Sequence, residues 1–204
     1  MRISDFSLPV LPARLLQLRE EATKGLDPAA ADDVLALLLA LARMRSPSFI
    51  LEIGTAEGLT AAALLVTCPE ARLVSIENDP DRHARAEQNL AGFGVSDRAE
   101  LLFGDAAEIL PRLRETFGLI FLDGPKAQYI RYLPVLKKLL APRGVLVADD
   151  VLLYGWVRGQ VQPPPKRRSI AERLREYLDA VLSDPDFLTF VAEAGEGVAV
   201  SVLR

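Results

Sequence analysis

In two short stretches of the sequence, a run of apolar residues is followed directly by acidic residues. In "FGLIFLDG" the acid after the apolar run is Asp123, and in "GVLVADD" the acids are Asp149 and Asp150. If these runs form neighbouring strands, their three carboxylates converge, and a divalent cation would relieve the repulsion among them. The pattern therefore predicts a metal site of three aspartates. An all-oxygen site suits Mg²⁺ and also admits Mn²⁺ or Ca²⁺.

Lys126, three positions after Asp123, is the candidate general base. Pro125 favours the first turn of a helix at this point, and a cation there is opposed by the helix dipole and by a nearby metal ion. We therefore expect Lys126 to release its proton more readily than a free lysine, as a general base must. The alternative is an exposed lysine that pairs with a neighbouring acid.

The two runs belong to a series of five that alternates with four helical stretches. The five are "FILEIG", "RLVSIEND", "AELLFGD", "FGLIFLDG" and "GVLVADD". Each is continuously apolar, which is typical of strands covered by helices on both faces, so we predict a doubly wound, mostly parallel α/β sheet. After a helix near 169–183, "FLTFVAEAG" and "EGVAVSVLR" are separated by a Gly/Glu turn and predict an antiparallel hairpin, which makes seven strands.

The N-terminal part has a different pattern. Leucines recur at helical spacing over 12–45, which predicts two helices split near "GLDP". We expect a helical segment, 1–46, before one main domain, 47–204.

Composition excludes several classes of protein. The net charge of −4 argues against binding nucleic acid through overall charge, although "PPPKRRSIAERLR" is a local basic stretch. One cysteine, Cys68, excludes an internal disulfide or a cysteine metal cluster. The longest apolar runs fall short of the ~20 residues of a membrane span, and the N-terminus lacks the features of a signal peptide. We expect a cytoplasmic protein.

The loop after the first run points to a ligand that is not a pyrophosphate. Gly54 and Gly58 allow a tight turn and close approach of the backbone to a ligand. Their spacing matches neither the dinucleotide fingerprint nor the phosphate loop. Glu52 beside this loop would repel phosphate and attract an ammonium or sulfonium group.

Acids also end the second and third runs. Glu77 lies 23 residues after Gly54, where an acid can accept hydrogen bonds from ribose hydroxyls. Asp105 and Ala106 would then lie near the base of a nucleoside, or Asp105 is the N-cap of the following helix. A cationic nucleoside fits both observations.

These motifs carry a resemblance to a known family. The sequence resembles the class I S-adenosylmethionine-dependent methyltransferases and, more closely, the cation-dependent O-methyltransferases, the group of catechol O-methyltransferase and its bacterial relatives. The resemblance covers 47–204 and rests on "LEIGTAEGLT", "SIEND", "GDA", "FLDGPKAQY", "VADDV" and "GEGVAVSVLR".

The resemblance implies roles for individual residues. The methionine part of the cofactor would be held by Glu52, Gly54 and Thr60, its ribose by Glu77, and its adenine side by Asp105 and Ala106, with Asp123 also counted among the cofactor-binding residues. It implies the same three metal ligands and a homodimer. The family often has Asn where this chain has Asp150, and the extra charge should tighten cation binding while lowering the Lewis acidity of the ion.

The implied reaction is methyl transfer to oxygen. A metal chelated by two adjacent substrate oxygens lowers the pKa of one hydroxyl, Lys126 accepts the proton, and Asp123 helps to hold the site while the oxygen attacks the sulfonium methyl.

The substrate stays open between a catechol-like small molecule and 5-hydroxyuridine in tRNA. Gly124 and Pro125 stand where catechol O-methyltransferase has bulky aromatic residues. The basic loop of Lys166, Arg167 and Arg168 is more similar to relatives that methylate tRNA.

Other residues and functions are less specific. His83 lies among charged residues and is expected to face solvent. Tyr154 and Trp156 would either wall the substrate pocket or belong to the core. A nicotinamide-dependent oxidoreductase and a noncatalytic nucleotide-binding protein are the alternative functions; the glycine spacing argues against the first and Lys126 against the second.

Overall fold

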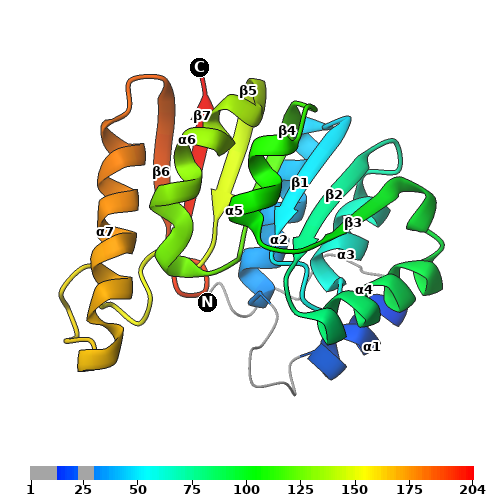
Figure 1. Ribbon diagram of the computed structural model, residues 1–204, viewed down its shortest axis with the longest axis horizontal. Helices are drawn as coiled ribbons and strands as arrows, with labels where there is room; N and C mark the ends of the chain where they lie inside the picture. Colours follow the sequence, from blue (N-terminus) through cyan, green and yellow to red (C-terminus); the bar gives the residue numbers. More distant parts are fainter. Residues whose placement is uncertain (1–12, 23–29) are drawn as a thin grey trace, which may run out of the picture.

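A seven-stranded sheet forms the centre of the molecule. The computed structural model describes residues 13–22 and 30–204, and in these ranges the strand order is β3-β2-β1-β4-β5-β7-β6 (Figure 1). The strands are β1 (Phe49–Ile53), β2 (Arg72–Glu77), β3 (Ala99–Phe103), β4 (Phe117–Leu122), β5 (Leu140–Ala148), β6 (Phe187–Ala192) and β7 (Val198–Leu203). The first five are mutually parallel, and β7 runs antiparallel to both β5 and β6. The predicted sheet and its terminal hairpin are confirmed.

Helices cover both faces of the sheet. The helices are α1 (Ala13–Ala22), α2 (Asp32–Arg45), α3 (Leu59–Thr67), α4 (Pro80–Phe93), α5 (Ala106–Ile109), α6 (Tyr129–Leu139) and α7 (Arg168–Ser183). One apolar core joins the sheet to α1 through α4, and a second joins the opposite face to α5, α6 and α7. Central strands buried in this way must be apolar along their whole length, and every residue of β4 is buried.

Two details of the helices differ from the sequence pattern. The helix expected after β3 stops at Ile109, and a 3-10 turn, Leu110–Arg112, follows because Pro111 lacks the backbone N–H that a continuing helix needs. A short 3-10 turn, Lys126–Gln128, also precedes α6. The expected break near "GLDP" lies outside the described residues. No helix within the described ranges is both long and apolar enough to cross a membrane.

The strand order places the functional loops at the carboxyl-terminal ends of the parallel strands. The chain order reverses between β1, which pairs with β2 on one side, and β4 on the other. Loops that leave the carboxyl ends of parallel strands on either side of such a reversal form the usual ligand crevice of these folds. Because β4 and β5 are adjacent, Asp123 and Asp149 lie side by side at these strand ends.

Candidate active site

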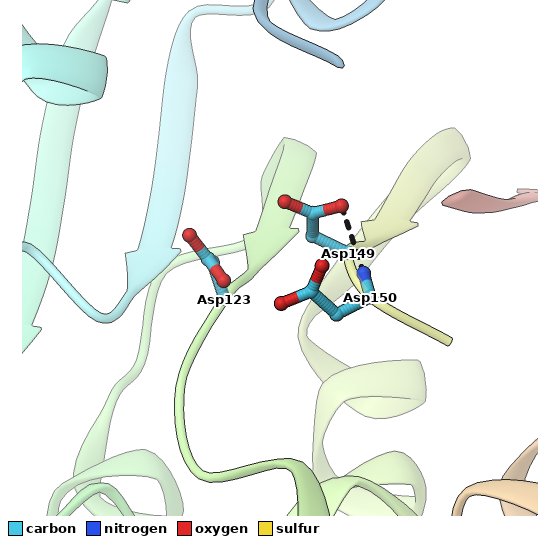
Figure 2. A group of neighbouring side chains, drawn as sticks. All are labelled: Asp123, Asp149 and Asp150. Atoms are coloured by element: carbon cyan, nitrogen blue, oxygen red, sulfur yellow. Dashed lines mark hydrogen bonds between the residues drawn. The ribbon is translucent and has the colours of Figure 1, made fainter. Parts of the chain in front are cut away.

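Three carboxylates meet where β4 and β5 end. Leu122 pairs with Ala148 in the sheet, so the next residues, Asp123 and Asp149, start from adjacent positions. One oxygen of each of Asp123, Asp149 and Asp150 lies within 4.8 Å of the others. Figure 2 shows the three side chains together at these strand ends, with the Asp149 carboxylate accepting the backbone N–H of Asp150 at 2.8 Å. The predicted cluster is thus present.

Burial makes this cluster electrostatically unfavourable. Asp149 is 3% exposed, and burial, followed by the charges of Asp123 and Asp150, raises the pKa of its carboxyl above the usual range. Hard oxygen donors that repel one another in a partly buried position are the donor set that Mg²⁺, Mn²⁺ and Ca²⁺ prefer. The residues present therefore fit a divalent metal ion.

Lys126 is in direct contact with the cluster. Its Nζ lies 2.6 Å from Asp123 Oδ1 and 3.1 Å from Asp150 Oδ2, and its side chain is 18% exposed. Burial lowers its pKa, but the neighbouring Tyr129 and the carboxylates of Asp123, Asp150 and Asp149 together outweigh burial and raise the pKa well above the usual value. The protein groups alone thus raise the pKa, whereas the lower pKa expected from the sequence depended in part on a nearby metal ion and stays a prediction.

Asp150 adopts a backbone conformation that few side chains accept. Its φ is 56°, in the left-handed region. Asn and Asp are the side chains that enter this region most readily after glycine. The backbone thus gives a physical reason why Asp or Asn would stand at this position.

Tyr129 contacts the backbone that carries the acid cluster. The sequence did not predict this role. Its hydroxyl is fully buried and lies 2.9 Å from the carbonyl oxygen of Leu122 and 3.2 Å from that of Asp149. The hydroxyl therefore connects the residue before Asp123 to Asp149 itself, where β4 and β5 end. The only signal in the sequence is its place three residues after Lys126 in a helix start.

The loop after β1 lies directly against the loop that carries Asp123. Gly54 has φ 98°, and a Cβ placed there would meet the carbonyl group of Asp123, with its carbon at 2.8 Å, and the nitrogen of Gly124 at 3.2 Å. Only glycine fits between the two backbones. The predicted cofactor loop and the acid cluster are thus in contact.

Glu52 lies beneath that loop and is fully buried. Its Oε2 accepts a 2.5 Å hydrogen bond from Ser75, whose hydroxyl is also 2.5 Å from that of Thr55. Burial raises the pKa of Glu52 to about 8. Its Oε1 has no hydrogen-bond partner among the described residues, so one buried acceptor is left for a donor. Thr60, in the first turn of α3, is also buried.

The acids that end β2 and β3 have backbone partners. Glu77 accepts the N–H groups of Ala56 at 2.8 Å and of Asn78 and Asp79 at 2.9 Å each, which joins the loops after β1 and β2. Asp105 accepts the N–H of Ala107 at 2.8 Å and is the N-cap of α5, as one of its two readings predicted. Ala106 is buried beside it. The ribose and adenine roles of Glu77, Asp105 and Ala106 stay predictions.

Three further expectations from the sequence concern His83, the pair Tyr154 and Trp156, and the basic residues near α7. The expectation that His83 faces solvent is wrong, because its side chain is 16% exposed and its ring packs edge-on against Phe103 at 5.6 Å. Tyr154 is 58% exposed and its ring lies 5.0 Å from that of the half-buried Trp156, so Tyr154 is not a core residue. Three basic residues are exposed around the start of α7, namely Lys166, Arg167 and Arg168.

Comparison with known proteins matches this arrangement to methyltransferases. A family model described as a methyltransferase domain matches 51–151. The O-methyltransferase imqG of Aspergillus flavus is 30% identical over 168 residues, which cover 75% of this chain and 68% of that protein. A catechol O-methyltransferase of Niastella koreensis is 29% identical over 171 residues, 80% of this chain and 77% of that protein.

A solved structure extends the match to most of the chain. The O-methyltransferase TomG of Streptomyces achromogenes, solved in complex with S-adenosylmethionine, superposes with a TM-score of 0.82 at 26% identity. The match covers 96% of this chain and 91% of that one.

Proposed function

The chain belongs to the S-adenosylmethionine-dependent O-methyltransferases of the catechol O-methyltransferase type, and from this premise we propose that it methylates a hydroxyl beside a second oxygen with a divalent metal ion. The observation that carries the proposal is the contact of Lys126 with Asp123 and Asp150 inside a cluster of three carboxylates. A nicotinamide-dependent oxidoreductase and a noncatalytic nucleotide-binding protein are not supported by this membership.

Asp123, Asp149 and Asp150 would hold the metal ion. Asp149 is buried at the floor of the cluster, while Asp123 and Asp150 are partly open to solvent and to a substrate. When bound, Mg²⁺ would orient two adjacent substrate oxygens and lower the pKa of one hydroxyl. The hydrogen bonds of Tyr129 to the ends of β4 and β5 would keep the three carboxylates in register.

Lys126 would accept the substrate proton at Nζ. Its ion pairs with Asp123 and Asp150 fix the position of the amine at the cluster. The same carboxylates favour the protonated lysine. A divalent charge shared among them would offset part of this effect and move the pKa of Lys126 downward, toward the range of a general base.

The loops after β1, β2 and β3 would hold the methyl donor. Gly54 lies in tight contact with the Asp123 loop, so a methionine moiety bound by the loop after β1 would lie next to the acids. The unpartnered Oε1 of Glu52 would accept a bond from the cationic part of the donor, Thr60 would line the methionine side, and Glu77 would reach the ribose. Asp105 and Ala106 would border the adenine.

Two observations support two substrate classes. A relative over most of the chain is named a catechol O-methyltransferase, which favours a small molecule with vicinal oxygens. The exposed basic residues at the start of α7 favour 5-hydroxyuridine in tRNA instead, because phosphates attract such a surface. Both substrates present two oxygens to one metal ion.

One assay separates these outcomes. The protein is incubated with labelled S-adenosylmethionine, Mg²⁺ and either bulk tRNA or a panel of catechols, with and without excess EDTA. We expect transfer that stops in EDTA and returns with added Mg²⁺; full activity in EDTA would contradict metal dependence. Charge reversal of Lys166, Arg167 and Arg168 should abolish transfer to tRNA and leave transfer to catechol unchanged.

We further propose a homodimer, located in the cytoplasm. Leu188 and Phe190 on the edge strand β6 are 63% and 52% exposed, and an apolar edge of this kind is usually covered. Light scattering should give a molar mass twice that of one chain, and the Leu188→Glu variant should have the mass of one chain.

A further inference from the structure

The turn between β6 and β7 lies against the segment that follows the acids of β5. The backbone N–H of Val151 donates to the carbonyl oxygen of Gly197 at 2.9 Å. The N–H groups of Leu152 and Leu153 both donate to the carbonyl oxygen of Glu196, at 2.9 and 3.1 Å. Three consecutive residues after Asp150 are thus held by a turn more than forty positions away in the sequence.

The Glu196 side chain adds a fourth bond of a different kind. Its Oε2 accepts the backbone N–H of Tyr154 at 2.6 Å. A charged acceptor makes this bond stronger than a bond between neutral groups. Glu196 therefore binds Leu152 and Leu153 with its main chain and Tyr154 with its carboxylate.

The segment held in this way has a strained backbone. Asp150, Leu153 and Tyr154 have φ values of 56°, 39° and 55°, in the left-handed region that side chains other than glycine rarely adopt. Each such residue costs about 1 kcal/mol or more and persists only where its surroundings enforce it. The bonds to the turn are among the contacts that hold this backbone in place.

Close packing fixes the turn itself. Gly197 has φ 91°, and a Cβ there would lie 2.7 Å from Leu152 Cδ1 and 2.8 Å from Leu152 Cβ. On its other side the turn is bound to α2, because the N–H of Gly195 donates to Asp33 Oδ2 at 3.1 Å. The turn is therefore a fixed support between α2 and the segment after Asp150.

We propose that Glu196 is a positioning residue of the methyl-transfer site. By holding 151–154 in place it sets the left-handed conformation of Asp150, and with it the distance of the Asp150 carboxylate from Lys126 and from the cation. It also sets where the exposed Tyr154 ring stands beside Trp156. This inference rests on the proposed function for its effect on metal binding, and on the hydrogen bonds alone for its effect on the segment.

The test compares Glu196→Ala with a conservative variant and a matched control. Glu196→Gln keeps an oxygen that can accept the Tyr154 N–H. Glu193→Ala removes an acid from the same hairpin that pairs with Arg158 at 2.7 Å, outside the bonds described above. For each full-length variant, Mg²⁺ and S-adenosylhomocysteine binding are measured by calorimetry, and amide hydrogen exchange is followed in a peptide that covers 150–156.

Glu196→Ala should bind Mg²⁺ about tenfold more weakly, the cost of one hydrogen bond to a charged group. Its affinity for S-adenosylhomocysteine should stay unchanged, and exchange in 150–156 should be faster. Glu196→Gln should restore most of the Mg²⁺ affinity, and Glu193→Ala should behave like the wild type. Equal losses of both affinities, or no rescue by Gln, would mean a general structural role and would overturn the proposal.

A second variant and a second readout keep the proposal testable. Gly197→Ala, which forces the turn away from Leu152, should weaken Mg²⁺ binding in the same way as Glu196→Ala. If the wild type itself binds no Mg²⁺, the metal assignment fails, but the exchange comparison still decides the role of Glu196. Unchanged exchange in 150–156 of Glu196→Ala would then overturn it.

Discussion

The acids at the ends of β2 and β3 differ from those at the ends of β4 and β5 in what surrounds their charge. Glu77 and Asp105 accept backbone N–H groups, which partner their oxygens locally and join turns together. Asp123 and Asp150 instead share one ammonium group, that of Lys126, beside a third carboxylate. An apolar run that ends on an acid therefore has two physical outcomes, a capped turn or a concentration of charge. The second is the one that calls for a cation.

The largest expected effect is the loss of the base at the crowded end. Lys126→Ala should lower kcat for methyl transfer by about 10²–10⁴-fold, the usual contribution of a positioned general base. Asp123→Ala and Asp149→Ala should abolish turnover through loss of the metal ion. The control is Lys138→Ala, because Lys138 is an exposed lysine of α6. Retained kcat in Lys126→Ala would assign the lysine a structural role.

Removing the buried charge should change both metal binding and pH dependence. Asp149→Asn should weaken Mg²⁺ binding by roughly 100-fold or more, given that even supporting groups around metal sites cost 10–100-fold. The pKa of Asp149 is raised in the folded protein above its ordinary value of 3.8. The neutral carboxyl therefore stabilises the fold at pH values below 3.8, and this contribution is lost as pH rises through the raised pKa.

The pH dependence is measured as Tm without added Mg²⁺. The Tm of the wild type should fall as pH rises above about 5, and the Tm of Asp149→Asn should fall less steeply. The remaining slope includes Glu52, whose pKa of about 8 acts in the same direction. Identical slopes for the two proteins would show that Asp149 carries no raised pKa.

Asp150→Asn should have a smaller effect. Asn tolerates the left-handed backbone at this position, so the fold should be unchanged. Loss of one unit charge at about 4 Å from a divalent ion in a water-like medium corresponds to about 2 kcal/mol, or about thirtyfold weaker Mg²⁺ binding. Calorimetry checks this value, and a loss as large as that of Asp149→Asn would contradict the difference in burial between the two acids.

Asp105→Ala should have the smallest effect on the metal site. Loss of the N-cap should lower the free energy of unfolding by about 1 kcal/mol, which denaturant titration measures. Mg²⁺ binding should not change, because Asp105 follows β3, which β2 and β1 separate from β4, and because Asp105 has its own backbone partner. Weaker Mg²⁺ binding here would mean that the two groups of acids are coupled.

The fold could be predicted from the sequence because the patterns that indicate its strands and its hairpin are local. Continuous apolar runs, each ended by an acid or a glycine turn, predict buried parallel strands, and the short Gly195–Gly197 turn predicts the hairpin. The three aspartates were predictable for the same reason, since Asp123 directly follows β4 and Asp149 and Asp150 are the two residues after β5. Pro111 was a local signal too, and it accounts for the shortened helix after β3.

What the sequence did not predict depends on contacts between distant segments. Tyr129 supports the cluster only because β4 and β5 end side by side, and Glu196 only because the hairpin returns beside β5. Two of the carboxylates that raise the pKa of Lys126, those of Asp149 and Asp150, follow a different strand from Lys126, so their effect also depends on side-chain positions. The lower pKa expected beside a metal ion stays a prediction. His83 was misplaced because its contact with Phe103 joins α4 to β3.

Binding of a divalent ion by the three aspartates can be observed by diffraction from crystals of the full chain grown with Mn²⁺, with data collected at the manganese absorption edge. We expect one anomalous peak among the carboxylates of Asp123, Asp149 and Asp150, and no peak there in Asp149→Asn. A wild-type crystal with Lys126 still bound between Asp123 and Asp150 and no anomalous peak at the cluster would contradict this expectation.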